Sequence, residues 1–376
     1  MSHDPRRPPP ARTSAPILVW AWPAFRRRDL QPYNALLYEA TTRADDGIEV
    51  VEANPRNAVG RRAPVIAHLH WPDAALKGAS NLQATFKLAR LWGILAFLRL
   101  RGARVVWTVH NVHPHERHHT GWFKALRWLL TRWVDGTILL SPAHVAPFLE
   151  TFPGLARRPR AIIPLGHYGP EIDRIRGGTT ATAPGTGEPP SGTLRFLFFG
   201  RLARYKGVED LVEAFAGWND PNARLVLAGL PDDPALSAEL QARTATDPRI
   251  VLSLRYNSES EMLAMMERAD WLVLPYKKIW SSSAALLALS LGCPLLTSDQ
   301  PTFRDLQREF GVRAVRCYSG TLRPDDLREA GRSRLTPEAR RALSTAARST
   351  RDWGMIGRET AAFFRHVAGQ PRRPRP

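Results

Sequence analysis

The chain has 376 residues, of which 44% are hydrophobic and 23% are charged, and this balance is typical of a folded protein with more than one domain. Its net charge of +18 calls for an anionic partner, which leaves nucleic acid, anionic lipid or a phosphorylated substrate open. The first residues lack the apolar core of a signal peptide, and no run of about 18 uncharged apolar residues exists, so we expect a cytoplasmic protein without a membrane span.

The first half of the chain alternates strand patterns with helical patterns. The predicted strands, which are apolar runs that end at polar residues, are 16–22, 65–70, 104–110 and 136–140. The predicted helices, in which apolar residues recur at helical spacing, are 30–42, 82–100 and 122–134. This order predicts a parallel, doubly wound sheet in an α/β domain.

A stretch rich in glycine, proline and threonine separates this half from a second alternation. The predicted strands there are 194–199, 224–228, 250–254 and 271–274, and the predicted helices are 208–216, 235–245 and 258–267. We predict two Rossmann-like domains facing across a cleft. Their predicted bounds are a basic tail at 1–15, a first domain at 16–175, a linker at 176–193, a second domain at 194–345, a helix at 346–368 that returns to the first domain, and a basic tail at 369–376.

The segment 196–207, FLFFGRLARYKG, has the composition of a diphosphate-binding turn. An apolar strand delivers the chain to the carboxyl edge of a sheet, where Gly200 allows a close turn and Arg201 and Lys206 can neutralise phosphate. A buried strand followed by a solvated basic turn explains this segment equally well when it is taken alone.

A second segment favours the phosphate interpretation. Ser281, Ser282 and Ser283 precede an apolar helix that follows the strand 271–274. A helix start at the carboxyl edge of a parallel sheet offers N–H groups, hydroxyls and a favourable dipole to phosphate, although serines there can be caps alone. Tyr276 is a further candidate for this diphosphate-binding site, and packing is its alternative role.

Histidines gather at two strand ends of the first domain, in HLHWPD (68–73) and HNVHPHE (110–116). No zinc-binding spacing accompanies them, and the only cysteines are Cys293 and Cys317, so we expect neither a metal site nor a disulfide framework. We predict instead that these groups orient a sugar hydroxyl. The residues with proposed roles are Glu116 or Asp73 as the base, His110 as a positioning group, and His70, Trp71 and Asn111 on the acceptor side.

The stretch 122–133, WFKALRWLLTRW, interleaves tryptophan with basic residues. Helical spacing of its apolar residues is typical of core packing. The alternative is an interfacial helix that contacts anionic lipid through Trp122, Lys124, Arg127 and Trp128. Nucleic acid could bind the same residues, but no recognised RNA- or DNA-binding module accompanies them, so we do not expect a nucleic-acid partner.

The chain resembles the GT-B glycosyltransferases, and more closely the xanthan-type members of glycosyltransferase family 94. The motifs that carry this resemblance are PYN (32–34), HLHWPD (68–73), VVWTVHNVHPHE (105–116), GHYG (166–169), FGRLARYKGVEDL (199–211), LVLPYKKIWSSSAALLALSLGCPLL (272–296) and RDWGMIG (351–357). The element GRxxxYKG is shared by many sugar transferases, whereas the histidine motifs are narrower.

The resemblance implies a metal-independent enzyme without a cofactor, peripheral on the cytoplasmic face of the membrane. Such an enzyme transfers mannose from GDP-mannose, with inversion, to a polyprenyl-diphosphate-linked oligosaccharide in exopolysaccharide biosynthesis. The chain departs from the wider group at two positions, since retaining GT-B enzymes usually carry two glutamates where this chain has Ile279 and Leu287. The loss of this pair argues against the ordinary retaining mechanism. A GT-B transferase that uses a UDP-sugar or makes another linkage is the closest alternative, and a basic nucleic-acid-binding protein is a remote one.

Overall fold

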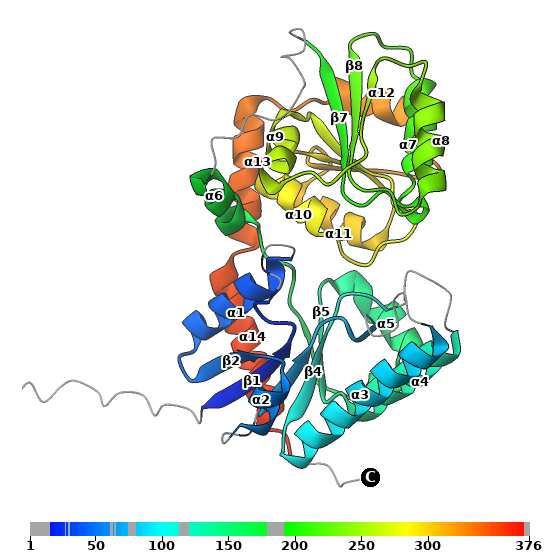
Figure 1. Ribbon diagram of the computed structural model, residues 1–376. Helices are drawn as coiled ribbons and strands as arrows, with labels where there is room; N and C mark the ends of the chain where they lie inside the picture. Colours follow the sequence, from blue (N-terminus) through cyan, green and yellow to red (C-terminus); the bar gives the residue numbers. More distant parts are fainter. Residues whose placement is uncertain are drawn as a thin grey trace, which may run out of the picture. The chain divides into compact units, whose positions relative to one another are not determined.

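The computed structural model describes residues 16–26, 28, 31–60, 63, 65–73, 80–112, 120–178 and 192–371 (Figure 1). Contacts between residues divide the chain into two compact units. Unit 1 contains the first strands and the last helix, and unit 2 contains most of the second half. The chain changes from one unit to the other after residues 140, 144, 164 and 352. Each unit is described below by itself.

Unit 1 is built on a parallel sheet of six strands. In sequence order they are β1 (Ile17–Trp22), β2 (Ile48–Glu52), β3 (Ile66–Leu69), β4 (Arg104–Val109), β5 (Gly136–Leu139) and β6 (Arg160–Ile162). Their order in the sheet is β2-β1-β3-β4-β5-β6. The four central strands were predicted from their apolar runs. The edge strands β2 and β6 were not, because their residues are less buried and their pattern is weaker.

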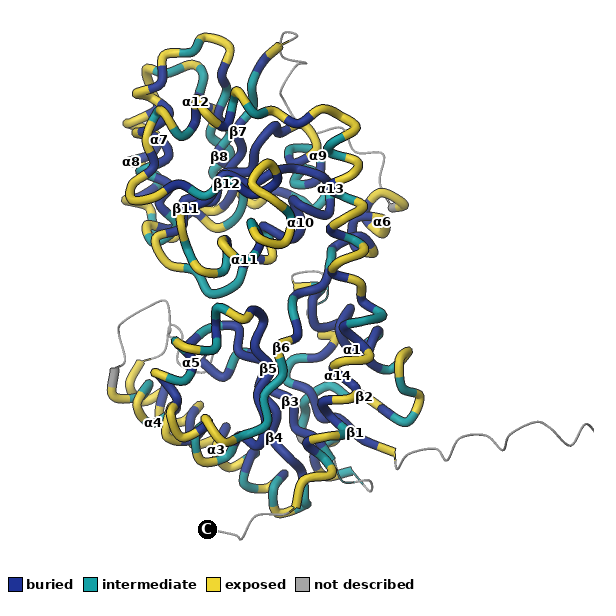
Figure 2. Tube along the Cα trace, turned by 180° about the vertical axis from the view of Figure 1, so that it is seen from behind, coloured by how far each residue is buried: buried dark blue, intermediate teal, exposed yellow. Residues whose placement is uncertain are grey.

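Helices cover both faces of this sheet. They are α1 (Tyr33–Ala44), α2 (Pro55–Val59), α3 (Asn81–Leu100), α4 (Thr120–Trp133), α5 (Val145–Thr151) and α14 (Trp353–Ala368). Figure 1 shows α1 and α14 on one face and α3 with α4 on the other, and Figure 2 shows the same from behind. The crossing of α1 and α14 is close because Gly357 lies against the backbone of Ala40, where a Cβ would be 2.3 Å from the carbonyl oxygen.

Unit 2 is built on a second six-stranded parallel sheet. Its strands are β7 (Leu194–Phe199), β8 (Ala223–Ala228), β9 (Ile250–Ser253), β10 (Trp271–Leu274), β11 (Leu295–Ser298) and β12 (Val315–Tyr318). The order β12-β11-β10-β7-β8-β9 is that of a Rossmann fold, in which the chain reverses its direction of travel between the two central strands. Ligands of such sheets bind outside the carboxyl ends of those strands, here β7 and β10.

Eight helices of unit 2 lie among the described residues. They are α6 (Gly169–Gly178), α7 (Val208–Ala216), α8 (Pro234–Thr244), α9 (Glu259–Arg268), α10 (Ser283–Ser290), α11 (Pro301–Phe310), α12 (Pro324–Arg332) and α13 (Pro337–Thr350). Four of them begin at polar caps, since Asp233, Ser258, Ser282 and Thr336 each accept a hydrogen bond from a backbone N–H of the first turn.

The structure moves two of the predicted domain bounds. Residues up to 175 were assigned to the first domain, but α6 belongs to unit 2, where Arg174 and Arg176 form ion pairs with Glu259 and Glu267 of α9. The predicted linker starts at 176, yet α6 continues to Gly178, and 179–191 lie outside the described residues. The predicted returning helix starts at 346, whereas α14 starts at Trp353 because the preceding residues complete α13.

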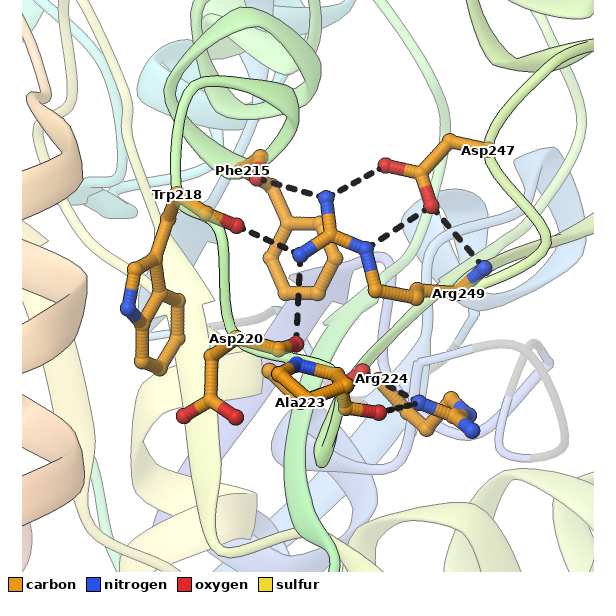
Figure 3. Close-up of polar contacts among 8 residues, drawn as sticks. Phe215, Trp218, Asp220, Ala223, Arg224, Asp247 and Arg249 are labelled. Carbon is orange, nitrogen blue, oxygen red and sulfur yellow. Dashed lines mark hydrogen bonds and ion pairs between the residues drawn. The ribbon is translucent and has the colours of Figure 1, made fainter.

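Arg249 stabilises the amino ends of β8 and β9 in unit 2 (Figure 3). Its guanidinium donates to the Asp247 carboxylate at 2.9 and 2.6 Å and to the carbonyl oxygen of Asp220 at 3.2 Å, and it lies 5.1 Å from the ring centre of Phe215. Hydrogen bonding to Arg249 lowers the pKa of Asp247. One half-buried cation thus holds the segment after α7 against the start of β9.

We expect Arg249→Ala to lower the local free energy of unfolding of unit 2 by about 2–3 kcal/mol, because it leaves a carboxylate and carbonyl groups unsatisfied. Hydrogen exchange measured by mass spectrometry on β8 and β9 reports this quantity. Arg255→Ala is the matched control: Arg255 also pairs with a carboxylate, but its side chain is 51% exposed, against 14% for Arg249. Equal effects of the two variants would contradict the assignment.

Candidate active site

Three histidines of unit 1 form one buried hydrogen-bonded cluster with Tyr38 of α1. The Tyr38 hydroxyl lies 2.7 Å from Nδ1 of His68 and 2.7 Å from Nε2 of His70. Nε2 of His68 lies 2.8 Å from the hydroxyl of Thr108 on β4, and Nδ1 of His70 lies 2.9 Å from Nε2 of His110. The ends of β3 and β4 therefore bring the two histidine motifs together, as neighbouring parallel strands should.

Burial keeps two histidines of this cluster, His68 and His70, neutral. It lowers the pKa of His68 to about 3, and burial followed by the rings of His68 and His110 holds the pKa of His70 well below its usual range. A neutral ring donates one hydrogen bond and accepts one, and the hydroxyl of Tyr38 donates to a single ring. The cluster thus has two consistent directions of donation, and each direction fixes whether Nε2 of His110 accepts from His70 or donates to it.

Aromatic side chains fix the ring of His110 from two sides. Trp71 stacks on it with ring centres 4.2 Å apart, and Tyr33 of α1 contacts it edge-on at 5.3 Å. The structure thus brings the predicted residues His70, Trp71 and His110 together. His70 is almost fully buried, however, so it supports His110 from behind and is not a direct acceptor contact.

Of the two predicted catalytic bases, the structure describes Asp73 but not Glu116. Asp73 is buried three residues after His70. Glu116, with His113 and His115, lies outside the described residues, and Asn111 is half-buried next to His110. In the described part of the chain, no three histidine, cysteine, aspartate or glutamate side chains are arranged to hold a metal ion, and Cys293 and Cys317 are free thiols.

In unit 2, glycines form a bare backbone surface at the carboxyl ends of β7 and β8. Gly200 and Gly229 have φ values of +121° and +146°, and a Cβ on Gly229 would lie 1.9 Å from the carbonyl oxygen of Gly200. The loop that follows β7 ends at Gly207, where φ is +67° and a Cβ would lie 2.2 Å from the oxygen of Pro275. Only glycine fits these positions, so the loop is held against both neighbouring strands.

Two cations of this loop, Arg201 and Lys206, interact electrostatically. Burial lowers the pKa of Lys206 to about 8, while Asp232 raises it and Arg201 lowers it. Nζ of Lys206 lies 5.4 Å from the ring centre of Tyr276, and Arg201 forms an ion pair with Asp232. A desolvated ammonium near an exposed guanidinium, at the switch point of a Rossmann sheet, has the chemistry of a diphosphate site.

Asp232 was not predicted as part of this site. It follows β8, the strand next to β7, and its backbone N–H donates to the carbonyl oxygen of Leu202 at 2.8 Å. The segment LPDD (230–233) carries the sequence signal for this residue. An acidic residue that follows one strand lies at the same sheet edge as a basic loop that follows the neighbouring strand. The role of Asp232 was not evident without the strand order.

The three serines have different positions at the start of α10. Ser282 is buried and caps the helix by accepting from the N–H of Ala285 at 3.2 Å, Ser283 is exposed as the first helical residue, and Ser281 is half-buried. Tyr276 is buried beside Ser282, and burial raises its pKa. Tyr276 therefore supports Lys206 and the start of α10 by packing. Its side chain does not reach solvent, where it could contact the donor substrate.

The amphipathic helix α4 has both a core side and an exposed basic side. Leu126, Leu129 and Leu130 are buried in unit 1, which is the packing role weighed for this stretch. Trp128 is 64% exposed, and the other candidate contacts comprise two exposed cations and one half-buried tryptophan, namely Lys124, Arg127 and Trp122. Among the described residues, no acidic partner lies within ion-pair distance of either cation.

Comparison with known proteins identifies the kind of enzyme. Residues 184–349 match the family model of glycosyl transferases group 1. The chain is 32% identical over 335 residues to the GDP-mannose:glycolipid 4-beta-D-mannosyltransferase of Xanthomonas campestris pv. campestris (strain ATCC 33913), which covers 87% of this chain and 85% of that protein. The chain belongs to the group 1 glycosyltransferases. This glycosyltransferase is also 29% identical over 290 residues to the glycogen synthase of Mycobacterium tuberculosis, covering 71% of this chain and 65% of that one.

Solved structures show the fold of this glycosyltransferase. One, described as trehalose-6-phosphate from E. coli bound with UDP-2-fluoro glucose, matches with a TM-score of 0.62 and 11% identity over 95% of this chain and all of that one. Another, Anabaena Alr3699/HepE in complex with UDP, matches with a TM-score of 0.58 and 13% identity over 94% of this chain and all of that one. The predicted α/β GT-B fold is confirmed.

Proposed function

We propose that this glycosyltransferase transfers mannose from GDP-mannose to a polyprenyl-diphosphate-linked oligosaccharide, with inversion, in exopolysaccharide biosynthesis. The observation that carries the proposal is the 32% identity, over most of both chains, to a GDP-mannose:glycolipid mannosyltransferase. The residues of both units are compatible with this chemistry, and their roles are considered in turn.

The donor diphosphate binds at the basic loop of unit 2. Lys206 is held in place by burial and by Tyr276, so its charge is ready where the leaving diphosphate develops charge. Arg201 exchanges its ion pair with Asp232 for a phosphate oxygen. The N-terminus of α10 adds backbone N–H groups and a favourable dipole. In this proposal these groups stabilise the leaving GDP without a metal ion.

In unit 1, a carboxylate acts as the base and His110 positions the acceptor. Asp73 or Glu116 takes the proton of the acceptor hydroxyl as its oxygen attacks the anomeric carbon. The new glycosidic bond forms as the bond to the GDP oxygen breaks, and the electron pair leaves with the diphosphate. The buried cluster of His68, His70 and Tyr38 keeps the His110 ring fixed in orientation.

Inversion is supported by the residues at the start of α10. Leu287, at one of the two positions where retaining relatives usually carry glutamate, is a buried residue of α10, and Ile279 is half-buried before it. Neither offers a carboxylate to the face of the sugar opposite the acceptor. A single displacement by the acceptor oxygen does not require one.

We propose that the enzyme works on the anionic, cytoplasmic surface of a membrane. Among the helices of the described residues, none has the length and apolar content of a membrane span. The support for a surface site is the exposed side of α4, where Trp128 lies between basic residues as in interfacial helices.

Binding and transfer measurements together test the proposed function. We expect GDP and GDP-mannose, but not UDP or ADP, to raise the melting temperature, and the effect to persist in EDTA. Labelled mannose should then pass from GDP-mannose to a lipid-linked oligosaccharide, with an inverted anomeric configuration by NMR. Selective response to UDP would overturn the sugar and keep the fold. No response to any nucleotide, together with salt-dependent binding to RNA or DNA, would overturn the proposal.

A further inference from the structure

Unit 1 contains a cavity of about 590 Å³ on the face of the sheet that α2 and α3 cover. This volume lies within the range of small-molecule sites. The residues that line it come from β1, the end of β2, α2 and α3: Trp20, Trp22, Ala53, Asn54, Ala58, Val59, Lys87, Arg90, Leu91, Gly93, Ile94 and Phe97. No part of the proposed sugar chemistry uses these residues.

Two polar side chains of the inner wall, those of Asn54 and Trp20, already have hydrogen-bond partners. Asn54 caps α2 through its side-chain oxygen, which accepts from the N–H of Asn57 at 2.8 Å, and its amide donates to the carbonyl oxygen of Glu52 at 3.3 Å. The indole N–H of Trp20 donates to the carbonyl oxygen of Asn54 at 3.3 Å. The rest of the inner wall is mainly aromatic and aliphatic carbon, with the backbone of Gly93 among it, so it favours an apolar ligand over a sugar or a base.

The rim of the cavity is cationic. Lys87 and Arg90 are exposed, lie one turn apart on α3, and form no ion pair with any described residue. The sequence from residue 74 to residue 115 contains no aspartate or glutamate. Around this rim α3 exposes large apolar side chains, among them Phe86 at 70%. An apolar interior with a cationic rim is complementary to a hydrocarbon chain that carries an anionic headgroup.

The cavity lies at the same end of the sheet as the histidine cluster. Trp22 is the last residue of β1, and its carbonyl oxygen accepts from the N–H of His70 at 3.1 Å. His70 in turn hydrogen-bonds to His110. The two sites occupy opposite faces of the sheet, since the cluster packs against α1 and the cavity against α3 (Figure 1). This placement favours the lipid of the acceptor over a bulk membrane lipid.

We propose that this cavity binds the isoprenoid chain of the acceptor, with Lys87 and Arg90 on its diphosphate. The assignment rests on the proposed lipid-linked acceptor, but the cavity and its rim belong to unit 1 alone. It gives the acceptor a hydrophobic binding site besides the contacts of its terminal sugar.

The test is calorimetric binding of farnesyl diphosphate, a short isoprenoid diphosphate, to the full chain without detergent and with saturating GDP to occupy unit 2. Gly93→Phe places a ring in the cavity, and a Cβ at Gly93 meets nothing within 4 Å. We expect it to weaken binding at least about tenfold. Gly121→Phe is the matched control, because Gly121 is also helical, exposed and free of contacts within 4 Å but does not line the cavity. It should bind like the wild type.

Further binding measurements separate the contribution of the isoprenoid chain from that of the diphosphate headgroup. Inorganic diphosphate should bind much more weakly than farnesyl diphosphate, and Lys87→Gln with Arg90→Gln should bring farnesyl diphosphate towards the affinity of farnesol. Equal binding by wild type and Gly93→Phe, or by the two diphosphates, would overturn the proposal. Tighter binding of dihexanoyl phosphatidylglycerol, lost in Gly93→Phe, would assign the cavity to a membrane lipid instead. The increase in melting temperature that GDP causes should be the same in Gly93→Phe as in the wild type. A failure of the proposed GDP-mannose donor can therefore be distinguished from a failure of the proposed lipid site.

Discussion

Lys206→Ala is expected to lower the rate of glycosyl transfer by about 100- to 1000-fold, because a fixed charge at the leaving diphosphate is lost from a desolvated position. The measurement is kcat and kcat/KM with GDP-mannose. Lys277→Ala is the matched control: Lys277 follows the neighbouring strand β10, but it is exposed and paired with Asp210. Activity within a few-fold of wild type for Lys206→Ala would remove Lys206 from the donor site.

The pKa of Lys206 gives this result a signature in pH. Since burial lowers that pKa to about 8, the ammonium is lost from the free enzyme as pH rises through 8, and kcat/KM should fall there. Stability should change in the opposite direction. Between about 8 and the ordinary value near 10.5 the unfolded chain binds more protons at this residue, so its contribution to the free energy of unfolding rises with pH. Lys206→Ala should remove both dependences.

Asp73→Asn is expected to lower transfer by about 100- to 10,000-fold while GDP binding stays unchanged, provided that Asp73 is the base. Asp46→Asn, the same change at an exposed position of unit 1, is the control and should have full activity. Glu116→Gln, measured in parallel, tests the other candidate. Full activity in both Asp73→Asn and Glu116→Gln would place the base elsewhere, and His110→Gln would be measured next.

Prediction from sequence succeeded where burial is strongest. The central strands β4, β7 and β10 are predominantly apolar and are followed by histidine, glycine and proline, so their bounds were predicted to within a residue. The edge strand β6 has three residues, none of them fully buried, and its pattern does not differ from that of a loop. Likewise α6 begins at Gly169 and runs into a glycine-rich segment, so its helical spacing was hidden by the predicted linker.

The candidate sites show the same limit. The ends of strands placed His68, His70 and His110 at one edge, but their connection depends on Tyr38, which α1 contributes about 30 residues earlier. No periodicity links a tyrosine on a helix to a histidine on a strand. Asp232 was missed for a related reason, because its pairing with Arg201 follows from β8 lying next to β7 in the sheet.

The contact between Gly200 and Gly229 also limits how this enzyme can be redesigned. A side chain at Gly229 would meet the carbonyl oxygen of Gly200 before it could meet any ligand. Substitutions at this position therefore lower the stability of the fold without changing the specificity of the enzyme. A library that seeks a new donor sugar should therefore keep both glycines unchanged.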